Sequence, residues 1–245
     1  MANRKVPFVN EEIYHVFNRG VDKREIFLDK FDVERFFFSM LIFNSIDPSI
    51  SVYSKSFELE LVQNNQLRSS TPKLNKLINF YNNNSEDHLV EFIAYCLNLN
   101  HFHFVIRQKV DGGISEFMKR IGGYTCYFNK RYKRTGSLFG SRFKAVYVKD
   151  NTQLLHLSAY VNLNNQLRGS TPKLTTPKLS KSSWGEYVGK EEKKDKNNEK
   201  EICRKEIILD QFKTKEKYKD FALNSLEDIV RRKNNEKEYE VLLVE

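Results

Sequence analysis

The chain has 245 residues, of which 40% are hydrophobic, enough for one sizeable α/β domain with appendages or for two small domains. Lys and Arg exceed Asp and Glu by 41 − 32 = +9, and this balance favours a polyanionic partner, either nucleic acid or an anionic membrane surface. No apolar run approaches the ~20 residues that span a bilayer, the first residues lack the apolar core of a signal peptide, and Cys96, Cys126 and Cys203 form no C-x-x-C pair. We therefore expect a soluble cytoplasmic protein with reduced thiols, without a membrane partner, a disulfide framework or a zinc site.

A strand, a helix and a hairpin are predicted in the first half of the chain. Residues 14–18 alternate in polarity like a strand, and residues 33–43 have helical apolar spacing behind Asp32, which is a candidate helix cap. Residues 89–96 and 101–106 are extended runs separated by a short turn, as in a β-hairpin.

The second half continues the alternation of helices and strands. Residues 114–132 predict a helix interrupted at its glycine pair, residues 143–148 a strand, and residues 150–164 a helix that begins at Asp150. A weaker helical pattern covers residues 207–230. This order predicts an α+β fold, a ferredoxin-like antiparallel sheet with helices on one or both faces.

We predict one main domain, residues 1–180, with an insertion at about residues 45–87, followed by a charged linker and C-terminal helical segment, residues 181–245. A short polar sequence, NNQLRSSTPKL, begins at residue 64 and returns at residue 164 with one substitution. Two copies are too few for a repeat architecture, so we interpret them as surface loops.

The histidine pair in the segment Asn100-His101-Phe102-His103-Phe104 is a candidate metal site. Residues two apart on a strand point to the same face, so His101 and His103 would project together while the phenylalanines enter the core. Two imidazoles so placed can share one metal ion. They can equally be two half-exposed strand histidines without a ligand.

Tyr160 and Asn164 are four residues apart on the last predicted helix of the main domain, and therefore share a helical face. A tyrosine phenol can attack a phosphodiester as a nucleophile, and an amide oxygen can bind a metal. Taken alone, the pair is also compatible with an interfacial tyrosine and a helix-ending asparagine. Taken together with the histidines, it predicts a divalent site of His101, His103 and Asn164, for Mg²⁺ or Mn²⁺, beside the nucleophile Tyr160.

These segments resemble, in chain order, those of the REP-associated tyrosine transposases, members of the HUH single-tyrosine transposases and relatives of insertion-sequence transposases. The central match is AYCLNLNHFHF at residues 94–104. The others are YHVFNRG at 14–20, FMKR at 117–120, YFNKRY at 127–132, GSLF at 136–139, RFK at 142–144 and YVNLN at 160–164.

The resemblance implies a ferredoxin-like catalytic domain with both histidines on a central strand. It also implies DNA transposition, in which a helix-borne tyrosine forms a 5′-phosphotyrosine with single-stranded DNA and leaves a free 3′-hydroxyl. The implied partner is single-stranded DNA with hairpin or palindromic elements, so we expect a cytoplasmic, nucleoid-associated protein. Members of the family and its relatives act as monomers or dimers, so a homodimer is one expected assembly.

Basic and aromatic residues near the proposed site in the sequence are candidate DNA contacts, the cations for phosphates and the rings for unpaired bases. The set is Arg19, Lys119, Arg120, Lys130, Arg131, Lys133, Arg134, Arg142, Lys144, Tyr127 and Phe139. Two other hypotheses stay open: a non-catalytic hairpin-binding protein derived from a transposase, and an RNA-binding regulator supported only by charge and aromatic content.

Overall fold

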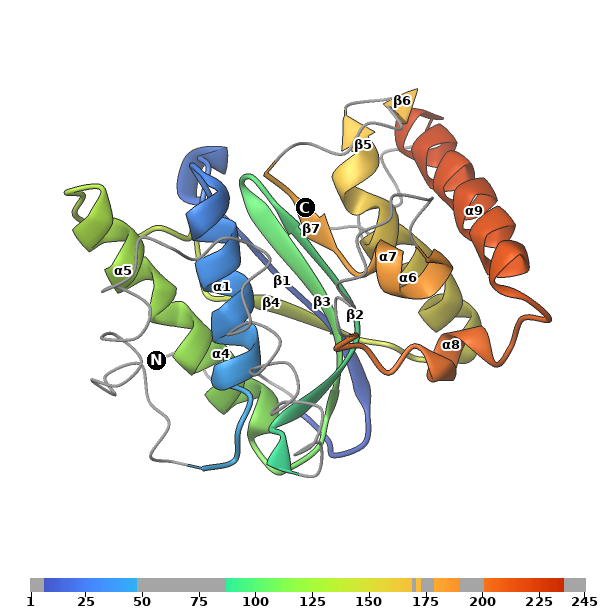
Figure 1. Ribbon diagram of the computed structural model, residues 1–245, viewed down its shortest axis with the longest axis horizontal. Helices are drawn as coiled ribbons and strands as arrows, with labels where there is room; N and C mark the ends of the chain where they lie inside the picture. The colour runs from blue at the N-terminus through green and yellow to red at the C-terminus, as the bar shows by residue number, and fades with distance from the viewer. Residues whose placement is uncertain (1–6, 48–86, 169–170, 173–178, 190–200, 236–245) are drawn as a thin grey trace.

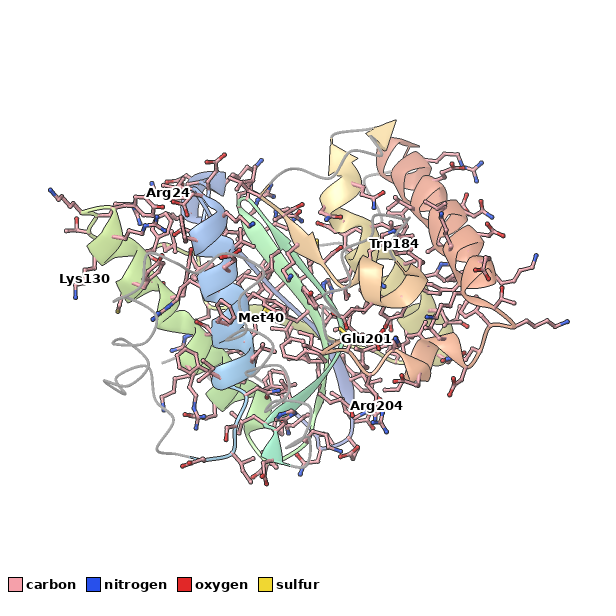
Figure 2. All side chains as sticks on the ribbon, viewed as in Figure 1. Arg24, Met40, Lys130, Trp184, Glu201 and Arg204 are labelled. Atoms are coloured by element: carbon pink, nitrogen blue, oxygen red, sulfur yellow. The ribbon has the colours of Figure 1, made fainter. Side chains whose placement is uncertain are left out.

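The computed structural model describes residues 7–47, 87–168, 171–172, 179–189 and 201–235. A central sheet separates two groups of helices (Figure 1): α1, α4 and α5 cover one face, and α6 to α9 lie on the other. Figure 2 shows Lys130 on α5 and Trp184 on α7 on opposite sides of this sheet. Most of the predicted insertion and the first copy of the repeat lie outside the described residues.

The sheet has five strands in the order β4-β1-β3-β2-β7, and every neighbouring pair is antiparallel. The strands are β1 (Ile13–Arg19), β2 (Val90–Asn98), β3 (His101–Gln108), β4 (Lys144–Tyr147) and β7 (Lys181–Ser182). Helices follow β1 and β3, and the first four strands lie in the order 4-1-3-2, which is the ferredoxin-like arrangement. The predicted fold class is confirmed, with the histidine strand β3 at the centre.

The hairpin β2–β3 is buried on both faces, because helices cover both sides of the sheet. Strand β2 is accordingly apolar over most of its length, whereas β3 begins with alternating histidines and phenylalanines that lie on opposite faces. A short separate ribbon pairs β5 (Leu167–Arg168) with β6 (Thr171–Pro172), within the second copy of the repeat.

The first helix begins earlier than predicted. α1 (Lys30–Ile42) is capped by Asp29, whose carboxylate accepts a hydrogen bond from the backbone N–H of Asp32 at 3.1 Å. The predicted cap, Asp32, is wrong: it lies inside the helix and is fully buried, and its carboxylate pairs with Arg131 at 2.8 Å. A buried carboxylate needs such partners, because leaving it unpaired would be costly.

The helix predicted over residues 114–132 with a break at its glycine pair is α4 (Gly113–Gly122) and α5 (Tyr124–Arg131), and the one predicted over residues 150–164 is α6 (Asn151–Leu163). The structure adds three short helices that the sequence did not predict: the 3₁₀ turns η1 (Val21–Lys23) and η3 (Asn164–Gln166), and α7 (Trp184–Val188). The C-terminal helices are α8 (Glu206–Leu209) and α9 (Lys215–Asn235). Asp150 caps α6 by accepting from the N–H of Gln153 at 2.8 Å. The single helix predicted over residues 207–230 is two helices, α8 and α9.

Helix α6 lies between the sheet and α9, and its apolar residues are therefore not confined to one narrow stripe. On α9, Tyr218, Ala222 and Leu226 are buried at intervals of four residues, which is the spacing of one helical face. The C-terminal segment thus packs on the helix that carries Tyr160.

Part of the core between the sheet and the helices α1 and α4 is aromatic. The fully buried ring of Phe104 on β3 lies 4.7 to 6.4 Å from four other phenylalanine rings, those of Phe36, Phe92, Phe102 and Phe117. All three cysteines are free thiols, as predicted. Within the described ranges, no helix is long and apolar enough to cross a membrane.

Replacing Phe104 by Ala is expected to lower the free energy of unfolding by about 3–5 kcal/mol, because it removes a fully buried ring and leaves a cavity. Urea denaturation followed by circular dichroism measures the change. The control is Leu28→Ala, since the Leu28 side chain is exposed, and it should cost less than about 1 kcal/mol. Equal losses in the two variants would contradict the assignment of Phe104 to the core.

Candidate active site between strand β3 and helix α6

The two histidines of the H-x-H motif lie side by side on β3 and face α6. Their ring centroids are 5.1 Å apart, and His103 is buried while His101 is partly exposed. Phe102 and Phe104 point to the opposite face, where both rings pack near Phe36. The alternation predicted from the sequence is therefore the one found in the strand.

Helix α6 brings the other two predicted residues to the histidines. Asn164 follows the last residue of the helix, and its Oδ1 lies 2.9 Å from Nε2 of His101. The ring of Tyr160, one turn earlier, lies 5.6 Å from the ring of His103 in an edge-on arrangement. Two segments about 60 residues apart in the chain thus converge on one site.

The hydrogen bonds around His101 orient its lone pair toward Asn164. The Nδ1 atom of His101 lies 2.6 Å from Oδ1 of Asn100, so the ring proton belongs on Nδ1 in the neutral imidazole. The side-chain amide nitrogen of Asn98 donates to Oδ1 of Asn164 at 2.5 Å and lies 3.0 Å from Nε2 of His101, so it contacts both acceptor atoms. Two acceptor atoms, Nε2 of His101 and Oδ1 of Asn164, therefore face each other.

This donor set is compatible with a divalent cation. Two acceptor atoms this close repel each other unless a positive partner contacts both, a role that the Asn98 amide has here and that a bound cation would take. Imidazole nitrogen and amide oxygen are both known ligand types for divalent metals, with imidazole leaning to Mn²⁺ over Mg²⁺. In the described part of the chain, no group of three or more His, Cys, Asp or Glu could hold a metal, and the set here is two histidines and an asparagine.

One buried residue at this site was not assigned a role from the sequence. Nε2 of His15 on β1 lies 2.9 Å from Nδ1 of His103, and burial lowers the pKa of His15 to about 3, so its ring is neutral at pH 7. The sequence motif at residues 14–20 contains His15, but no sequence pattern indicates a role for this residue. Only the pairing of β1 with β3 places His15 next to His103.

Tyr160 is only 1% exposed, and its ring lies edge-on to both His103 and His15. In this conformation Tyr160 is therefore shielded from solvent. Tyr124, another tyrosine that follows the histidines in the chain, lies elsewhere: it is a core residue whose hydroxyl donates to the carbonyl of Ile26 at 2.7 Å, and burial raises its pKa far above the usual range.

A buried hydrogen-bond network holds α6 in place. The hydroxyl of Tyr218 on α9 lies 2.9 Å from the side-chain amide of Asn162 and 3.1 Å from the hydroxyl of Ser158. The Oδ1 atom of Asn162 accepts from the hydroxyl of Ser183 at 2.5 Å, and Ser183 also bonds the backbone of Tyr95 on β2. Ser158 and Asn162 flank Tyr160 in the helix, so this network anchors the turn that carries the tyrosine.

Replacing Tyr218 by Phe is expected to lower the free energy of unfolding by about 1–3 kcal/mol, because it leaves the buried amide of Asn162 without its acceptor. Thermal and urea unfolding measure the loss. Tyr147→Phe is the matched control, since the Tyr147 hydroxyl bonds Glu12 at the surface, and it should change stability by less than about 0.5 kcal/mol. A Tyr218 variant as stable as this control would show that the network does not anchor α6.

Two of the predicted DNA-binding cations lie on the same face of the sheet as the histidines. Arg19 is the cross-strand partner of His101, and Lys144 is the partner of Phe17, which in turn pairs with His103. Cross-strand partners project to the same face. The Nζ atom of Lys144 lies 5.9 Å from the centre of the Phe17 ring, which agrees with that placement.

The other predicted DNA-binding residues lie on the opposite side of the sheet. Arg120 is buried, and its guanidinium bonds Glu116 at 2.9 Å and the carbonyl of Ser45 at 2.7 Å. Arg131 is paired with Asp29 and Asp32. The remaining members of this group lie on or after α5, as follows: Tyr127, Lys130, Lys133 and Arg134.

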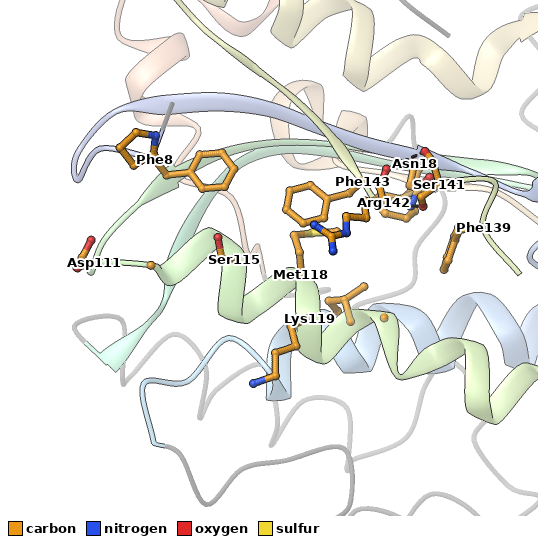
Figure 3. Close-up of a pocket in the computed structure, with 15 residues that line it drawn as sticks. Phe8, Asn18, Asp111, Ser115, Met118, Lys119, Phe139, Ser141, Arg142 and Phe143 are labelled. Atoms are coloured by element: carbon orange, nitrogen blue, oxygen red, sulfur yellow. Dashed lines mark hydrogen bonds between the residues drawn. The ribbon is translucent and has the colours of Figure 1, made fainter. Parts of the chain in front are cut away.

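A pocket of about 880 Å³ lies between α4 and the strands (Figure 3). Three residues predicted to contact DNA line it, Lys119, Phe139 and Arg142. The rings of Phe8 and Phe143 also line this pocket and are stacked at 6.4 Å. Phe102, the residue between the two histidines, closes the pocket from the sheet, so the pocket and the histidine site are on opposite faces.

Comparison with known proteins gives a family match and one structural match. No curated protein sequence matches the chain. A solved structure described as the REP-associated tyrosine transposase bound to a REP hairpin matches with a TM-score of 0.44 and 11% sequence identity, over 78% of this chain and 87% of that chain. Residues 65–164 match the family model for IS200-like transposases, and this range contains His101, His103, Tyr160 and Asn164. The resemblance to transposases that the sequence motifs indicated is thereby confirmed: residues 65–164 of this chain match the IS200-like transposase family.

Proposed function

We propose that this protein is a metal-dependent endonuclease and strand transferase that acts on single-stranded, hairpin-forming DNA through a 5′-phosphotyrosine. The observation that carries the proposal is the convergence of His101, His103 and Asn164 beside the ring of Tyr160. The histidines and the asparagine are suited to hold a divalent metal, and the tyrosine is suited to attack the phosphodiester. The match of residues 65–164 to a transposase family supports the same reaction class.

A divalent ion would be held by Nε2 of His101, Nε2 of His103 and Oδ1 of Asn164. The Nδ1 atoms of the two histidines are engaged with Asn100 and His15, which is why the Nε2 atoms are the proposed ligands. When bound, Mg²⁺ or Mn²⁺ would polarise the scissile phosphate and stabilise the departing 3′ oxygen.

Tyr160 is the proposed nucleophile. Its phenol oxygen forms a bond to phosphorus while the bond from phosphorus to the 3′ oxygen of the preceding nucleotide breaks. The phenol proton passes to water, and the departing 3′ oxygen takes up a proton from water, so the step is balanced. The products are a 5′-phosphotyrosine and a free 3′-hydroxyl. Attack by a 3′-hydroxyl on the phosphotyrosine reverses the step, which joins DNA ends and releases Tyr160.

Arg19 and Lys144 are the proposed phosphate contacts nearest to the site, since they project from the face that carries the histidines. The pocket on the other face offers Phe139 for stacking with an unpaired base, and Lys119 and Arg142 for phosphates. We leave Arg120 out of the proposed contacts, because its guanidinium is buried and bonded to the protein. The cations on and after α5 stay candidates: Lys130 and Lys133, which are exposed, and Arg134, which is partly buried.

A second candidate function is hairpin binding without catalysis. The observation in its favour is the burial of Tyr160, which places the nucleophile out of reach of DNA in this conformation. A protein that keeps this conformation would bind hairpins through its basic surface and form no covalent product.

The deciding experiment incubates purified protein with labelled single-stranded DNA that contains a hairpin from the flanks of its own gene. Samples with Mn²⁺ or with EDTA are resolved on denaturing and native gels. The proposal expects a covalent protein–DNA adduct that needs both the metal and the hairpin, and a scrambled strand of equal length is the control. A native-gel shift that does not depend on metal, with no adduct under any condition, would select the binding protein.

A further inference from the structure

His15 and His103 form a buried pair between strands β1 and β3. Their side chains are 4% and 3% exposed, Nε2 of His15 lies 2.9 Å from Nδ1 of His103, and the rings stack at 5.1 Å with 20° between their planes. The residue pairs His15–Val105 and Phe17–His103 are in register, so the two histidines are diagonal neighbours on one face. The register of the sheet thus fixes the contact.

A hydrogen bond between two imidazole nitrogens needs one proton, and its position decides what His103 can bind. If His15 donates, the proton of neutral His103 lies on Nε2, the nitrogen that faces the proposed metal site, and that nitrogen cannot be a ligand. If His103 donates through Nδ1, its Nε2 carries a lone pair. Only the second arrangement allows His103 to bind a metal.

We propose that His15 is a positioning residue, which accepts the Nδ1 proton of His103 and so holds that ring in the orientation and tautomer that bind the metal. The inference rests on the proposed function of this site. Metal-binding histidines commonly donate their second N–H to a fixed acceptor, most often a carboxylate or a carbonyl. Here an imidazole takes that place, and it approaches from a different strand.

The neighbours of His15 allow its packing and its acceptor function to be separated. Its ring stacks on Phe17 at 4.7 Å, so a phenylalanine at position 15 would have an aromatic partner and similar volume. His15→Phe removes the acceptor and keeps the ring, whereas His15→Gln removes the ring and keeps an acceptor in the place of Nε2. If His15 acts only by packing, the His15→Phe variant should behave like the wild type. If His15 acts as the hydrogen-bond acceptor, the His15→Gln variant should do so.

The first test measures the tautomer of His103 without any metal. Long-range ¹H–¹⁵N correlation spectra of the ¹⁵N-histidine-labelled protein distinguish protonation at Nδ1 from protonation at Nε2. We expect Nδ1 protonation in the wild type and in His15→Gln, and a shift toward Nε2 protonation in His15→Phe. Nε2 protonation of His103 in the wild type would overturn the inference, and this result does not depend on whether any variant folds.

The second test measures the affinity for Mn²⁺ by titration, with free Mn²⁺ followed by electron paramagnetic resonance. His15→Phe should weaken binding by about 10- to 100-fold, and His15→Gln by no more than about threefold. His101→Ala is the control that identifies the site. Wild-type affinity in His15→Phe overturns the role of His15 alone. The proposed metal site is overturned if His101→Ala binds Mn²⁺ with wild-type affinity or if the wild type does not bind it. In that case the role of His15 is decided by the first test, the tautomer of His103.

Discussion

Replacing Tyr160 by Phe is expected to abolish the covalent protein–DNA adduct while hairpin binding and the fold persist. The substitution removes only the phenol oxygen, which is the proposed nucleophile, and losing a nucleophile costs at least ~10³-fold in rate. The ring that lies against His103 and His15 is retained, so the buried volume beside them stays filled. Adduct formation is measured on denaturing gels, binding on native gels, and folding by circular dichroism.

The matched control for this experiment is Tyr127, another tyrosine that follows the histidines in the chain. Tyr127→Phe on α5 should form the adduct at close to the wild-type rate, because that residue lies on the opposite side of the sheet and bonds Asp32 through its hydroxyl. If the adduct persists in Tyr160→Phe and disappears in Tyr127→Phe, the nucleophile is Tyr127 on α5 and not Tyr160. An adduct that persists in both variants would exclude both residues.

Removing one proposed metal ligand is expected to have an effect of similar size on the reaction. His101→Ala deletes the imidazole whose Nε2 faces Oδ1 of Asn164, and His103→Ala deletes the one held by His15. A metal that polarises a phosphate contributes several kcal/mol, so each variant should lose on the order of 10³-fold in the rate of adduct formation. Chelation of the wild type with EDTA should produce a comparable loss that added Mn²⁺ reverses.

His156→Ala is the control for these two variants. His156 lies on α6, the same helix as Tyr160, but its ring is exposed and faces α9, where Nδ1 lies 3.1 Å from the hydroxyl of Ser225. It should keep the metal-dependent activity. Full activity of His101→Ala or His103→Ala in the presence of EDTA would contradict a metal-dependent mechanism at this site.

The strands and most helices of the described region were predictable, because their signals are local. The alternating pattern of β1, the turn between β2 and β3, the glycine pair between α4 and α5, and the cap at Asp150 each depend on a few neighbouring residues. The errors were at positions decided by packing. Asp32 looks like a cap in the sequence, but it is buried with Arg131, a residue 99 positions away, and Asp29 caps the helix.

The candidate site was partly predictable for the same reason. The spacing of His101 and His103 and that of Tyr160 and Asn164 follow from the periods of a strand and a helix. Asn98 and Tyr218 were missed, because neither shares a recognisable spacing with the residue that it supports. Their contacts join segments 66 and 56 residues apart.

The sequence by itself determined which side chains share a face within one strand or one helix, since the backbone period sets that without reference to the rest of the chain. Only the tertiary structure decided that the histidine face of β3 meets α6, that His15 contacts His103 across 88 residues of sequence, and that most predicted DNA-binding cations lie on the other side of the sheet. Strand register and helix packing determine these relations. Both depend on long-range burial of apolar surface, which no short sequence pattern contains.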